Sequence, residues 1–408
     1  MKKRNFISYE DSIEKLDSLK MGVKGFEKTS LQNSLGRILA DDIVASENSP
    51  QFPTASLDGF AIKALDQKLD FLEIENIDNP AGGELGKFEL KNGFAIKTFT
   101  GSVMPKGSDT LIQIENVTPK DGKLFFDIKV SIGNGVRPVG EIYKTGDIIL
   151  KKGIKIGYAE IGVLASLNYP AVKVVQKPKV AILSTGSEIL EVGETQKTSS
   201  QIRSSNNYTL EALTLENGAI PIQMGIVKDD KTSLTEAIQN AIYSKAEIIV
   251  TTGGVSVGDY DFVDEVVKKV GFETVLHGVK IKPGQHILIA KNSENQVLIA
   301  LPGFAYSSTV TFILYVLPLI RNMLGLKFEP TVFQAKLREK FYKKSRKTEF
   351  TACNINFENG EILANFENKK VGTSAILTNM LDSSYLLFSS ENSGDKEISD
   401  IVDILQII

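Results

Sequence analysis

The chain has 408 residues, with 47 Lys and Arg against 50 Asp and Glu and a formal net charge of −3. Its length predicts about two to four domains, each large enough to bury a core. The near-neutral charge excludes a chain that is basic throughout, as a bulk nucleic-acid binder would be, but it does not exclude a local basic pocket. One cysteine and two histidines exclude an intrachain disulfide and a Cys-rich metal site. Any chemistry therefore has to use carboxylates, lysines, hydroxyls and backbone amides.

No targeting or membrane segment is recognisable. The N-terminus, MKKRNFISYEDSIEKL, turns polar and acidic before an apolar signal-peptide core forms. The longest apolar stretch, around Val310–Ile320, is interrupted by Thr311 and Pro318 and is too short to cross a bilayer. We therefore expect a soluble, cytoplasmic protein without membrane or nucleic-acid partners.

The first part of the chain alternates between helical and β-type patterns. Apolar residues at helical spacing over 13–19 and 31–39 predict two helices. Short β-type runs between Gly, Pro and Asn turns predict a compact β-rich domain over about 51–150. Residues 154–166 again have helical spacing, so the β-rich domain is expected to be inserted between two helical pieces.

From about residue 178, strands and helices alternate. The run 179–183, apolar from Val180 onward, predicts a strand buried on both faces, and similar strands are expected at 220–227, 247–252 and 296–301. The helices predicted in this region are 206–217, 231–244, 261–270 and 305–324. This alternation predicts a parallel sheet with crossover helices.

The pattern divides the chain into four domains. After residue 327 no helical period persists, and short strand-like runs predict a small β domain. The expected boundaries are residues 1–45 and 146–175 for a split helical domain I, 46–145 for the β-rich domain II, 176–326 for the α/β domain III, and 327–408 for domain IV.

Three glycine-bearing loops follow predicted strands, at the strand ends where open α/β sheets bind ligands. They are Ser184–Glu188, Thr251–Asp261 and Pro302–Phe304. The second loop combines paired glycines, hydroxyls and two acidic residues; glycines let the backbone approach an anion, and carboxylates suit Mg²⁺ bridging to phosphate. It contains neither a Walker-type P-loop motif nor the G-x-G-x-x-G fingerprint. Taken alone, each loop is as consistent with ordinary turn chemistry as with a site.

Charged groups near these loops are candidates for the same anion site. Lys280 and Lys282 lie on a predicted turn, where lysine is a natural partner of an anion, although exposed lysines are common. Glu188 and Asp259 are candidate Mg²⁺ ligands. The alternative for Asp259 is that it caps the helix predicted from residue 261.

A set of short motifs points to one family. The motifs lie at Ser56–Ala61, Thr100–Asp109, Arg137–Glu141, Ser184–Glu188, Ser205–Tyr208, Thr252–Asp261, Ile281–Gly284 and Leu301–Gly303. With these motifs the chain resembles the MoeA family of molybdopterin molybdenumtransferases, which is similar to the gephyrin E domain. They occur in the family's order across essentially the whole chain, and the ordered set is highly specific.

The resemblance implies a fold, an assembly and a reaction. It implies an elongated homodimer whose domain III is a three-layer, molybdopterin-binding-like α/β domain and whose domain IV is a small β-barrel. The implied site lies between domain III of one subunit and domain II of its partner. The implied reaction inserts molybdenum from molybdate into adenylylated molybdopterin, with Mg²⁺ as cofactor, and releases AMP. Other cofactor-assembly proteins are candidate partners.

The resemblance also implies the residues of the site. Asp58, Glu188, Asp259 and Lys282 match catalytic positions, with Glu188 and Asp259 as ligands of Mg²⁺. The substrate-binding positions are Thr100, Asp229, Asp230, Gly253, Gly254, Ser256, Gly258, Pro302, Gly303 and Ser307. Such a set stabilises developing negative charge and needs no side-chain nucleophile.

Three places depart from the family's motifs. Gln285 and His286 replace the usual Lys-Pro after K-P-G, Phe304–Tyr306 replaces Asn-Pro-Val, and Ala352 stands where arginine is usual. Losing two cations is expected to weaken or retune anion binding, since a charge-assisted contact is worth roughly 1.5–3 kcal/mol. The alternatives are therefore a non-catalytic pterin-binding or scaffolding paralogue, and a variant that prefers another oxyanion such as tungstate. A pterin adenylyltransferase is disfavoured, because such enzymes are a lone α/β domain.

Overall fold

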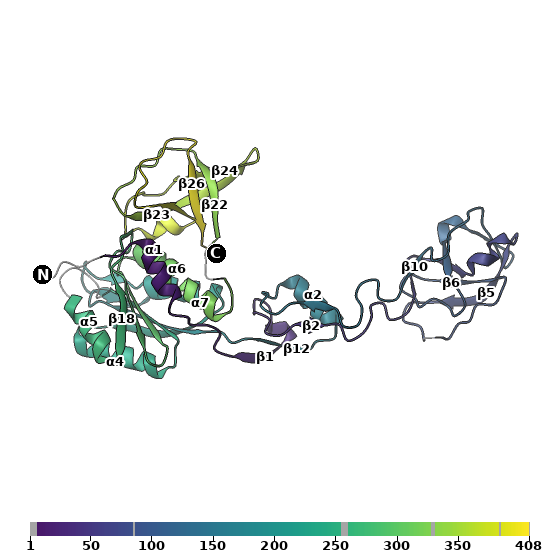
Figure 1. Cartoon of the computed structure of the whole chain (residues 1–408), viewed down its shortest axis with the longest axis horizontal. Coiled ribbons are helices and arrows are strands. Elements are labelled where there is room, and N and C mark those ends of the chain that lie inside the picture. The colour runs from purple at the N-terminus through teal and green to yellow at the C-terminus, as the bar shows by residue number, and fades with distance from the viewer. Residues whose placement is uncertain (1–5, 85, 254–259, 328–330, 383–384, 408) are drawn as a thin grey trace. The chain divides into compact units, whose positions relative to one another are not determined.

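The computed structural model describes residues 6–84, 86–253, 260–327, 331–382 and 385–407 (Figure 1). The chain folds into two compact units. Residues 41–170 form one unit, and residues 1–40 together with 171–408 form the other. Among the described residues, no helix is both long enough and apolar enough to cross a membrane.

The unit of residues 41–170 is built around a six-stranded sheet. In order across the sheet, its strands are β7 (Thr110–Gln113), β4 (Gly59–Ile62), β6 (Phe94–Thr98), β5 (Leu72–Asn79), β9 (Lys123–Phe125) and β8 (Thr118–Lys120). Phe60, Ile112 and Leu124 belong to its apolar core. The smaller elements are the strand pairs β3 (Thr54–Ala55) with β10 (Val136–Arg137) and β2 (Ile43–Val44) with β11 (Ile148–Leu150), the 3-10 turns η2 (Ala64–Lys68) and η3 (Ile114–Asn116), and the helix α2 (Tyr158–Ser166).

A second six-stranded sheet lies at the centre of the other unit. In order, its strands are β16 (Ile220–Val227), β13 (Lys179–Thr185), β17 (Ile248–Thr252), β21 (Val297–Leu301), β20 (Leu288–Asn292) and β18 (Phe272–His277). The first four strands are parallel, as predicted. The apolar pattern does not predict β18 and β20, and β20 runs antiparallel to both of its neighbours, so the sheet is mixed. A separate short pair of parallel strands, β14 (Ile189–Leu190) and β15 (Ile202–Arg203), follows β13 in the chain.

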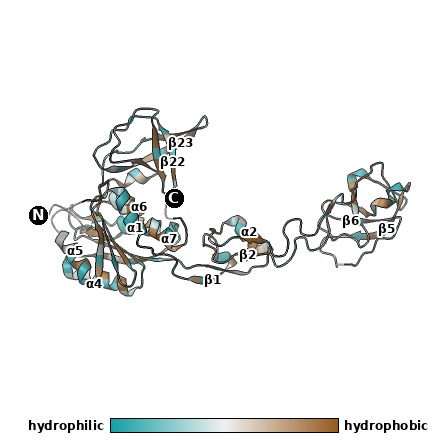
Figure 2. Cartoon of the chain, in the orientation of Figure 1, coloured by the Kyte–Doolittle hydropathy of each residue, from teal (hydrophilic) through white to brown (hydrophobic). Residues whose placement is uncertain are grey.

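Five helices cover the two faces of this sheet: α3 (Asn206–Glu216), α4 (Lys231–Tyr243), α5 (Tyr260–Lys269), α6 (Ala305–Tyr315) and α7 (Leu317–Met323). Val180 and Ile182 of β13 pack into a core with α3, α6 and α7, whereas Ala181 and Leu183 pack into a core with α4 and α5. This alternation follows from the two-residue period of a strand. Hydrophobic and hydrophilic residues are interspersed along α4 (Figure 2). The result is the three-layer α/β domain that we predicted.

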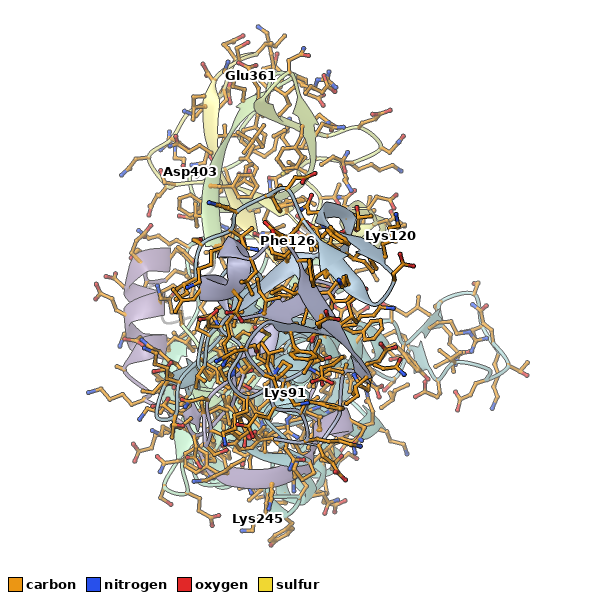
Figure 3. The ribbon with its side chains drawn as sticks, turned by 90° about the vertical axis from the view of Figure 1, so that its right-hand side faces the viewer. Lys91, Lys120, Phe126, Lys245, Glu361 and Asp403 are labelled. Atoms are coloured by element: carbon orange, nitrogen blue, oxygen red, sulfur yellow. The ribbon has the colours of Figure 1, made fainter. Side chains whose placement is uncertain are left out.

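A closed β-barrel follows the α/β domain. Its strands, in order, are β23 (Thr348–Glu358), β24 (Glu361–Asn365), β22 (Thr331–Leu337), β26 (Ile401–Gln406) and β25 (Tyr385–Ser389), and the 3-10 turn η4 (Leu377–Met380) precedes β25. Pairing of β23 with β25 closes the barrel. Glu361 and Asp403 lie on its outer surface (Figure 3). The short strand β19 (Ile281–Lys282) pairs with β23 and thereby connects the α/β domain to the barrel.

The N-terminal segment contains one of the two predicted helices. The helix α1 (Tyr9–Asp17) begins at Ser8, whose hydroxyl accepts a hydrogen bond from the backbone N–H of Asp11. The helix predicted over 31–39 is wrong, since that segment begins with a short 3-10 turn, η1 (Leu31–Asn33).

Pairing with a distant segment explains this difference. The strand β1 (Phe26–Ser30) precedes η1 and pairs antiparallel with β12 (Ala171–Val175). Leu39 forms a further bridge to Val174. A nine-residue helix is marginal by itself, and these long-range backbone hydrogen bonds stabilise an extended chain instead.

The long helix predicted over 305–324 is two helices, α6 and α7, that meet at Val316. Pro318 is the second residue of α7. Proline has no backbone N–H and its ring clashes with the preceding turn, so it is tolerated at the start of a helix and interrupts a longer one.

Candidate functional site

Buried hydroxyl groups join the carboxyl ends of β13 and β17. Ser184 Oγ donates to Asn207 Oδ1 over 2.6 Å and lies 2.8 Å from Thr252 Oγ1. Because a hydroxyl has one hydrogen, and Ser184 gives it to Asn207, Thr252 is the donor to Ser184. All three residues are buried. The network therefore holds two neighbouring strand ends against the start of α3.

Two glycines bring the loops after β17 and β21 into close contact. Gly253 has a φ of +89°, and a Cβ atom on it would lie 2.4 Å from the carbonyl oxygen of Thr185. A Cβ atom on Gly303 would lie 3.4 Å from the Cα atom of Gly253. Asn206 donates from its side-chain amide to the carbonyl oxygen of Gly303 over 2.9 Å. The missing side chains let the strand-end loops pack closely against one another, and the backbone N–H of Gly253 donates to the carbonyl oxygen of Leu301 over 3.2 Å.

Two acidic residues lie at the same edge of the sheet and differ in their partners. Asp230 caps α4: its carboxylate accepts from the backbone N–H of Ser233 over 2.9 Å and from the Ser233 hydroxyl over 2.7 Å. These bonds, the backbone one first, lower the pKa of Asp230. Glu188 is exposed and places its carboxylate beside Gly186. The Asp230 carboxylate is therefore hydrogen-bonded to the first turn of α4, whereas the Glu188 carboxylate faces solvent.

Part of the predicted set lies outside the described residues. Gly254, Ser256, Gly258 and Asp259 belong to this part, and their roles stay predictions. Within the described ranges, no group of three or more His, Cys, Asp or Glu side chains is arranged to hold a metal ion. Glu188 offers the hard carboxylate oxygen that Mg²⁺ prefers, so the described part of the site fits this ion in donor type.

Lys282 lies on β19, at the junction of the α/β domain and the barrel. Its ammonium group is 3.9 Å from Oε1 of Glu349, whose residue is 2% exposed. Ser345 donates to the same carboxylate oxygen over 2.7 Å. Lys282 and Glu349 both line a pocket whose other walls are Pro283, Tyr306, residues 350–352, residues 369–373 and Asn379. The lysine of the K-P-G motif is therefore part of a charged pocket.

The three departures from the family's motifs surround this junction. Tyr306 donates its hydroxyl to the carbonyl oxygen of Phe350 over 3.1 Å and accepts from the backbone N–H of Ala352 over 2.9 Å. Lys347 donates to the side-chain oxygen of Gln285. Tyr306 is thus bonded to the strand that carries Ala352, which links two of the replacements. The third, at Gln285, is bonded to a lysine of the barrel.

Asp58 and Thr100 form a contact within the unit of residues 41–170. The backbone N–H and the hydroxyl of Thr100 both donate to Oδ1 of Asp58, each over 2.7 Å. These bonds, the backbone one first, lower the pKa of Asp58. Both residues are exposed, so Asp58 presents an ionised carboxylate to solvent.

The remaining residues predicted to bind substrate lie in different places in the fold. Pro302 and Gly303 lie between β21 and α6, at the glycine-lined edge. Asp229 is exposed in the loop after β16. Ser307 is buried and donates its hydroxyl to the carbonyl oxygen of Ser374 over 2.9 Å, so it joins α6 to a barrel loop instead of facing the strand ends.

Several residues that shape these sites are absent from the predicted set. Asn206 and Asn207 are buried and link the strand ends to α3. Both stand in the sequence Ser-Asn-Asn-Tyr at the start of a predicted helix. This position indicates a helix cap, but it does not indicate that the two side chains bond the helix to the strand ends. Lys369 and Lys370 line the charged pocket, and nothing near them in the sequence indicates this, because the pocket's other lysine is about ninety residues earlier in the chain.

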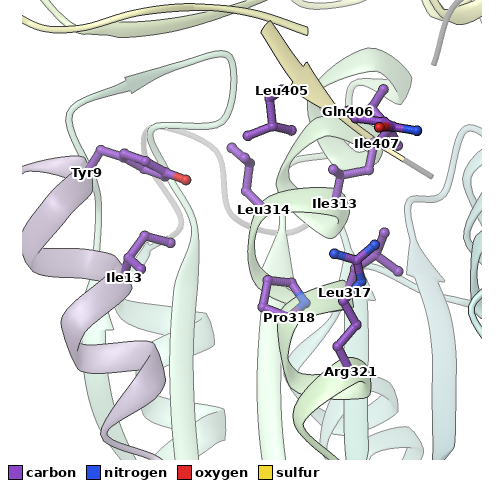
Figure 4. Close-up of a pocket in the computed structure, with 10 residues that line it drawn as sticks. All are labelled: Tyr9, Ile13, Ile313, Leu314, Leu317, Pro318, Arg321, Leu405, Gln406 and Ile407. Atoms are coloured by element: carbon purple, nitrogen blue, oxygen red, sulfur yellow. The ribbon is translucent and has the colours of Figure 1, made fainter. Parts of the chain in front are cut away.

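A second cavity is apolar and differs chemically from the charged pocket. Tyr9 and Ile13 of α1 face residues of α6 and α7 and the end of β26 across it (Figure 4). Arg321 is the charged side chain among its lining residues. Such a surface suits apolar contacts and not an anionic substrate.

The strand-end loops belong to an α/β domain of the class that binds ligands beyond the carboxyl ends of its parallel strands. Residues 7–168 match the family model described as "MoeA N-terminal region (domain I and II)". Residues 181–322 match the model described as "Probable molybdopterin binding domain".

Curated relatives and solved structures agree with these models. The chain is 32% identical to a molybdopterin molybdenumtransferase of a Nostoc species, over 85% of this chain and 80% of the relative. It is 33% identical to one of Staphylococcus epidermidis, over 84% and 82%. A crystal structure of the molybdopterin biosynthesis MoeA protein of Pyrococcus horikoshii matches with a TM-score of 0.84 and 28% identity, over 99% of this chain and 100% of that one. The chain therefore belongs to the MoeA family of molybdopterin molybdenumtransferases, and its role is in molybdenum cofactor biosynthesis.

Proposed function

We propose that this protein inserts molybdate-derived molybdenum into adenylylated molybdopterin and releases AMP. The observation that carries the proposal is the edge at the carboxyl ends of the parallel strands, where the loops after β13, β17 and β21 pack together at Gly253 and Gly303 and the nearby Glu188 of the first loop is exposed. An edge of this kind suits the phosphate groups of a nucleotide-linked substrate.

The residues of the chain have distinct roles in this proposal. The strand-end loops bind and orient the phosphates through backbone N–H groups, and Lys282 contributes positive charge near an anionic oxygen. Glu188 and Asp259 would hold Mg²⁺. When bound, this ion would neutralise charge on the phosphoanhydride. Asp58, kept ionised by Thr100, would contribute the carboxylate that the family resemblance implies comes from the partner subunit.

The proposed reaction uses no nucleophilic side chain of the protein. The state of the cysteine agrees with this proposal. Cys353 is fully buried, and burial raises the pKa of its thiol to about 12. A thiol in this state is a poor nucleophile at neutral pH. The substrate's own groups and bound water would therefore supply the bond-forming atoms.

Release of AMP from adenylylated molybdopterin, with Mg²⁺ and molybdate present, is the direct test. The wild-type protein should release AMP, and Glu188→Gln should lower the rate at least tenfold, because removing one charge-stabilising group at a reacting centre typically costs on the order of 10²–10³ in rate. Glu216→Gln is the matched control, since Glu216 is an exposed glutamate at the end of α3 and should leave the rate unchanged.

The same assay decides between this proposal and the alternatives. The substitutions at Gln285 and Ala352 favour a pterin-binding paralogue without activity, or a variant that prefers tungstate. AMP release with tungstate but not molybdate would indicate the second alternative. Pterin binding without AMP release in the presence of either oxyanion would contradict the enzymatic proposal.

A further inference from the structure

Lys282 belongs to a loop, residues 278–287, that joins β18 to β20 and contains β19; we name it the K-P-G loop after its motif. At the base of the loop, the backbone N–H of Gly278 donates to the carbonyl oxygen of Ile287 over 2.8 Å. Lys282 lies in the part of the loop beyond this bond. The position of its ammonium group therefore depends on the contacts that hold the loop against the rest of the domain.

The barrel and α6 provide two of these contacts. The strand β19 pairs with β23, and the backbone N–H of Thr348 donates to the carbonyl oxygen of Lys280 over 3.0 Å. Gly284 has a φ of +96°, and a Cβ atom on it would lie 2.1 Å from Cγ2 of Thr311 on α6. The K-P-G loop is therefore packed closely against both elements.

The N-terminal segment holds the base of the K-P-G loop. Ile7 forms a parallel bridge with Val279. Its backbone N–H donates to the carbonyl oxygen of Gly278 over 3.4 Å, and its carbonyl oxygen accepts from the backbone N–H of Lys280 over 2.8 Å. Ser8 caps α1 directly after this bridge, so the segment is itself anchored to a helix. The base of the loop is thus fixed by residues from the other end of the chain.

Phe6 adds a side-chain contact on both sides of this base. A Cβ atom on Gly278, whose φ is +87°, would lie 2.3 Å from Cδ1 of Phe6. The ring of Phe6 therefore occupies the space that a side chain at position 278 would need. The same ring meets the imidazole of His286 edge-on, with ring centroids 5.7 Å apart and an angle of 66° between the planes. Edge-on aromatic pairs are favourable beyond the area that they bury.

The contact between Phe6 and His286 involves one of the departures from the family's motifs. Proline is usual in the family where this chain has His286. A proline has no aromatic ring to pair with Phe6. This chain therefore has an additional link between its N-terminal segment and the loop that carries Lys282.

We propose that Phe6 is a positioning residue for Lys282. By filling the space over Gly278 and packing against His286, Phe6 fixes the base of the K-P-G loop and thereby the place of the Lys282 ammonium group. Electrostatic stabilisation depends on charges that are held in place before the reaction, so a small displacement of the lysine lowers the rate. This inference rests on the proposed function, and Phe6 acts through Lys282 and not on the substrate.

AMP release by full-length variants tests whether Phe6 acts through Lys282. F6A should lower kcat/KM roughly tenfold, because a misplaced charged group loses much of its effect. F6Y keeps the ring and should stay within about threefold of wild type. K282Q should lower kcat/KM at least about tenfold, and F6A/K282Q should match K282Q within about twofold, because two residues that act through one group are not additive. The control F357A removes an exposed phenylalanine of β23 and should leave kcat/KM unchanged.

A substitution on the loop side breaks the same contact without altering the N-terminal segment. H286A removes the ring that Phe6 meets and should lower kcat/KM by about threefold. F6A/H286A should match F6A within about twofold, since both changes remove one contact. This pair of variants tests the contact even if F6A alone destabilises the fold.

Hydrogen exchange followed by mass spectrometry gives a measurement that does not depend on activity. In F6A, the backbone amides of residues 278–287 should exchange at least about threefold faster than in wild type, because the base of the loop opens more often. Exchange in β17 should stay unchanged, and F357A should leave exchange in the K-P-G loop unchanged.

The outcomes separate this inference from the proposed function. Wild-type kcat/KM in both F6A and H286A would overturn the inference, and so would unchanged exchange of the K-P-G loop in F6A. A loss in F6A/K282Q equal to the product of the two single losses would overturn it as well, because Phe6 would then act independently of Lys282. In each of these cases the wild type still releases AMP, and the proposed function stands. A wild type that releases no AMP overturns the proposed function and, with it, the role of Phe6 in that reaction.

Discussion

At the scale of single residues, the contact between Asp58 and Thr100 shows how local hydrogen bonds prepare a carboxylate. Two donors converge on one oxygen of Asp58, and they lower its pKa below the ordinary value of 3.8. A depressed folded-state pKa means that the contact stabilises the fold above the unfolded-state value. The stabilisation is lost as the pH falls from 3.8 through the lower folded-state pKa. Asp58 is therefore ionised throughout the neutral and mildly acidic range.

Substitution of Thr100 by Val tests this account. The variant keeps the backbone donor, the larger cause of the shift, and loses the hydroxyl donor, so the pKa of Asp58 should rise toward 3.8 and stay below it. A carbon-detected NMR titration of the Asp58 carboxyl measures this value. Thr118→Val, an exposed threonine of β8, is the control. An unchanged Asp58 pKa in the Thr100→Val variant would show that the hydroxyl has no part in it.

At the scale of elements, the ends of the parallel strands depend on where glycine stands. Gly253 adopts a φ that favours glycine and has the carbonyl of Thr185 where a Cβ atom would lie, whereas Gly303 has only ordinary contact at its Cβ position. The two glycines lie close together, but the two positions differ in whether a side chain would fit there. The requirement for glycine therefore belongs to the β17 loop.

Paired alanine substitutions should reveal this difference. Gly253→Ala should lower the free energy of unfolding by about 1–3 kcal/mol, because the backbone is strained and the new methyl group meets backbone atoms. Gly303→Ala should change it by less than about 0.5 kcal/mol. Urea unfolding followed by circular dichroism compares the two variants. Equal stability of the two would contradict the assigned strain at Gly253.

Helices and strands could be predicted correctly where their apolar pattern is determined by neighbouring residues alone. Residues 180–183 are apolar throughout because both faces of β13 are covered, so a buried strand could be predicted from them. The segment 31–39 has helical spacing, yet β1 and Leu39 pair with β12, which lies more than 130 residues later. A local pattern contains no information on such a partner.

At the scale of the whole molecule, the predicted catalytic residues are divided between the two compact units. Asp58 and Thr100 belong to the unit of residues 41–170, and Glu188 and Lys282 belong to the other. The family resemblance implies that such a site combines residues of two subunits. We therefore propose that the protein is a homodimer with two composite sites.

Complementation between inactive variants tests the composite site. A 1:1 mixture of Asp58→Asn and Glu188→Gln proteins, dissociated and reassembled, should regain roughly a quarter of the wild-type AMP release, because half of the dimers are mixed and each contains one intact site. Each variant alone should be inactive, and light scattering should report a dimer. Absence of recovery in verified mixed dimers would place each site within a single chain.

By itself, the sequence determined the family, the alternation of strands and helices and the glycine loops, because these are properties of neighbouring residues and ordered motifs. Only the tertiary structure decided that Asp230 serves as a helix cap, that Ser307 joins α6 to the barrel, and that Tyr306 is bonded to the strand carrying Ala352. It also placed Lys369 and Lys370 in one pocket with Lys282. These contacts join residues far apart in the chain, and such proximity is produced by packing of whole elements and not by local preference.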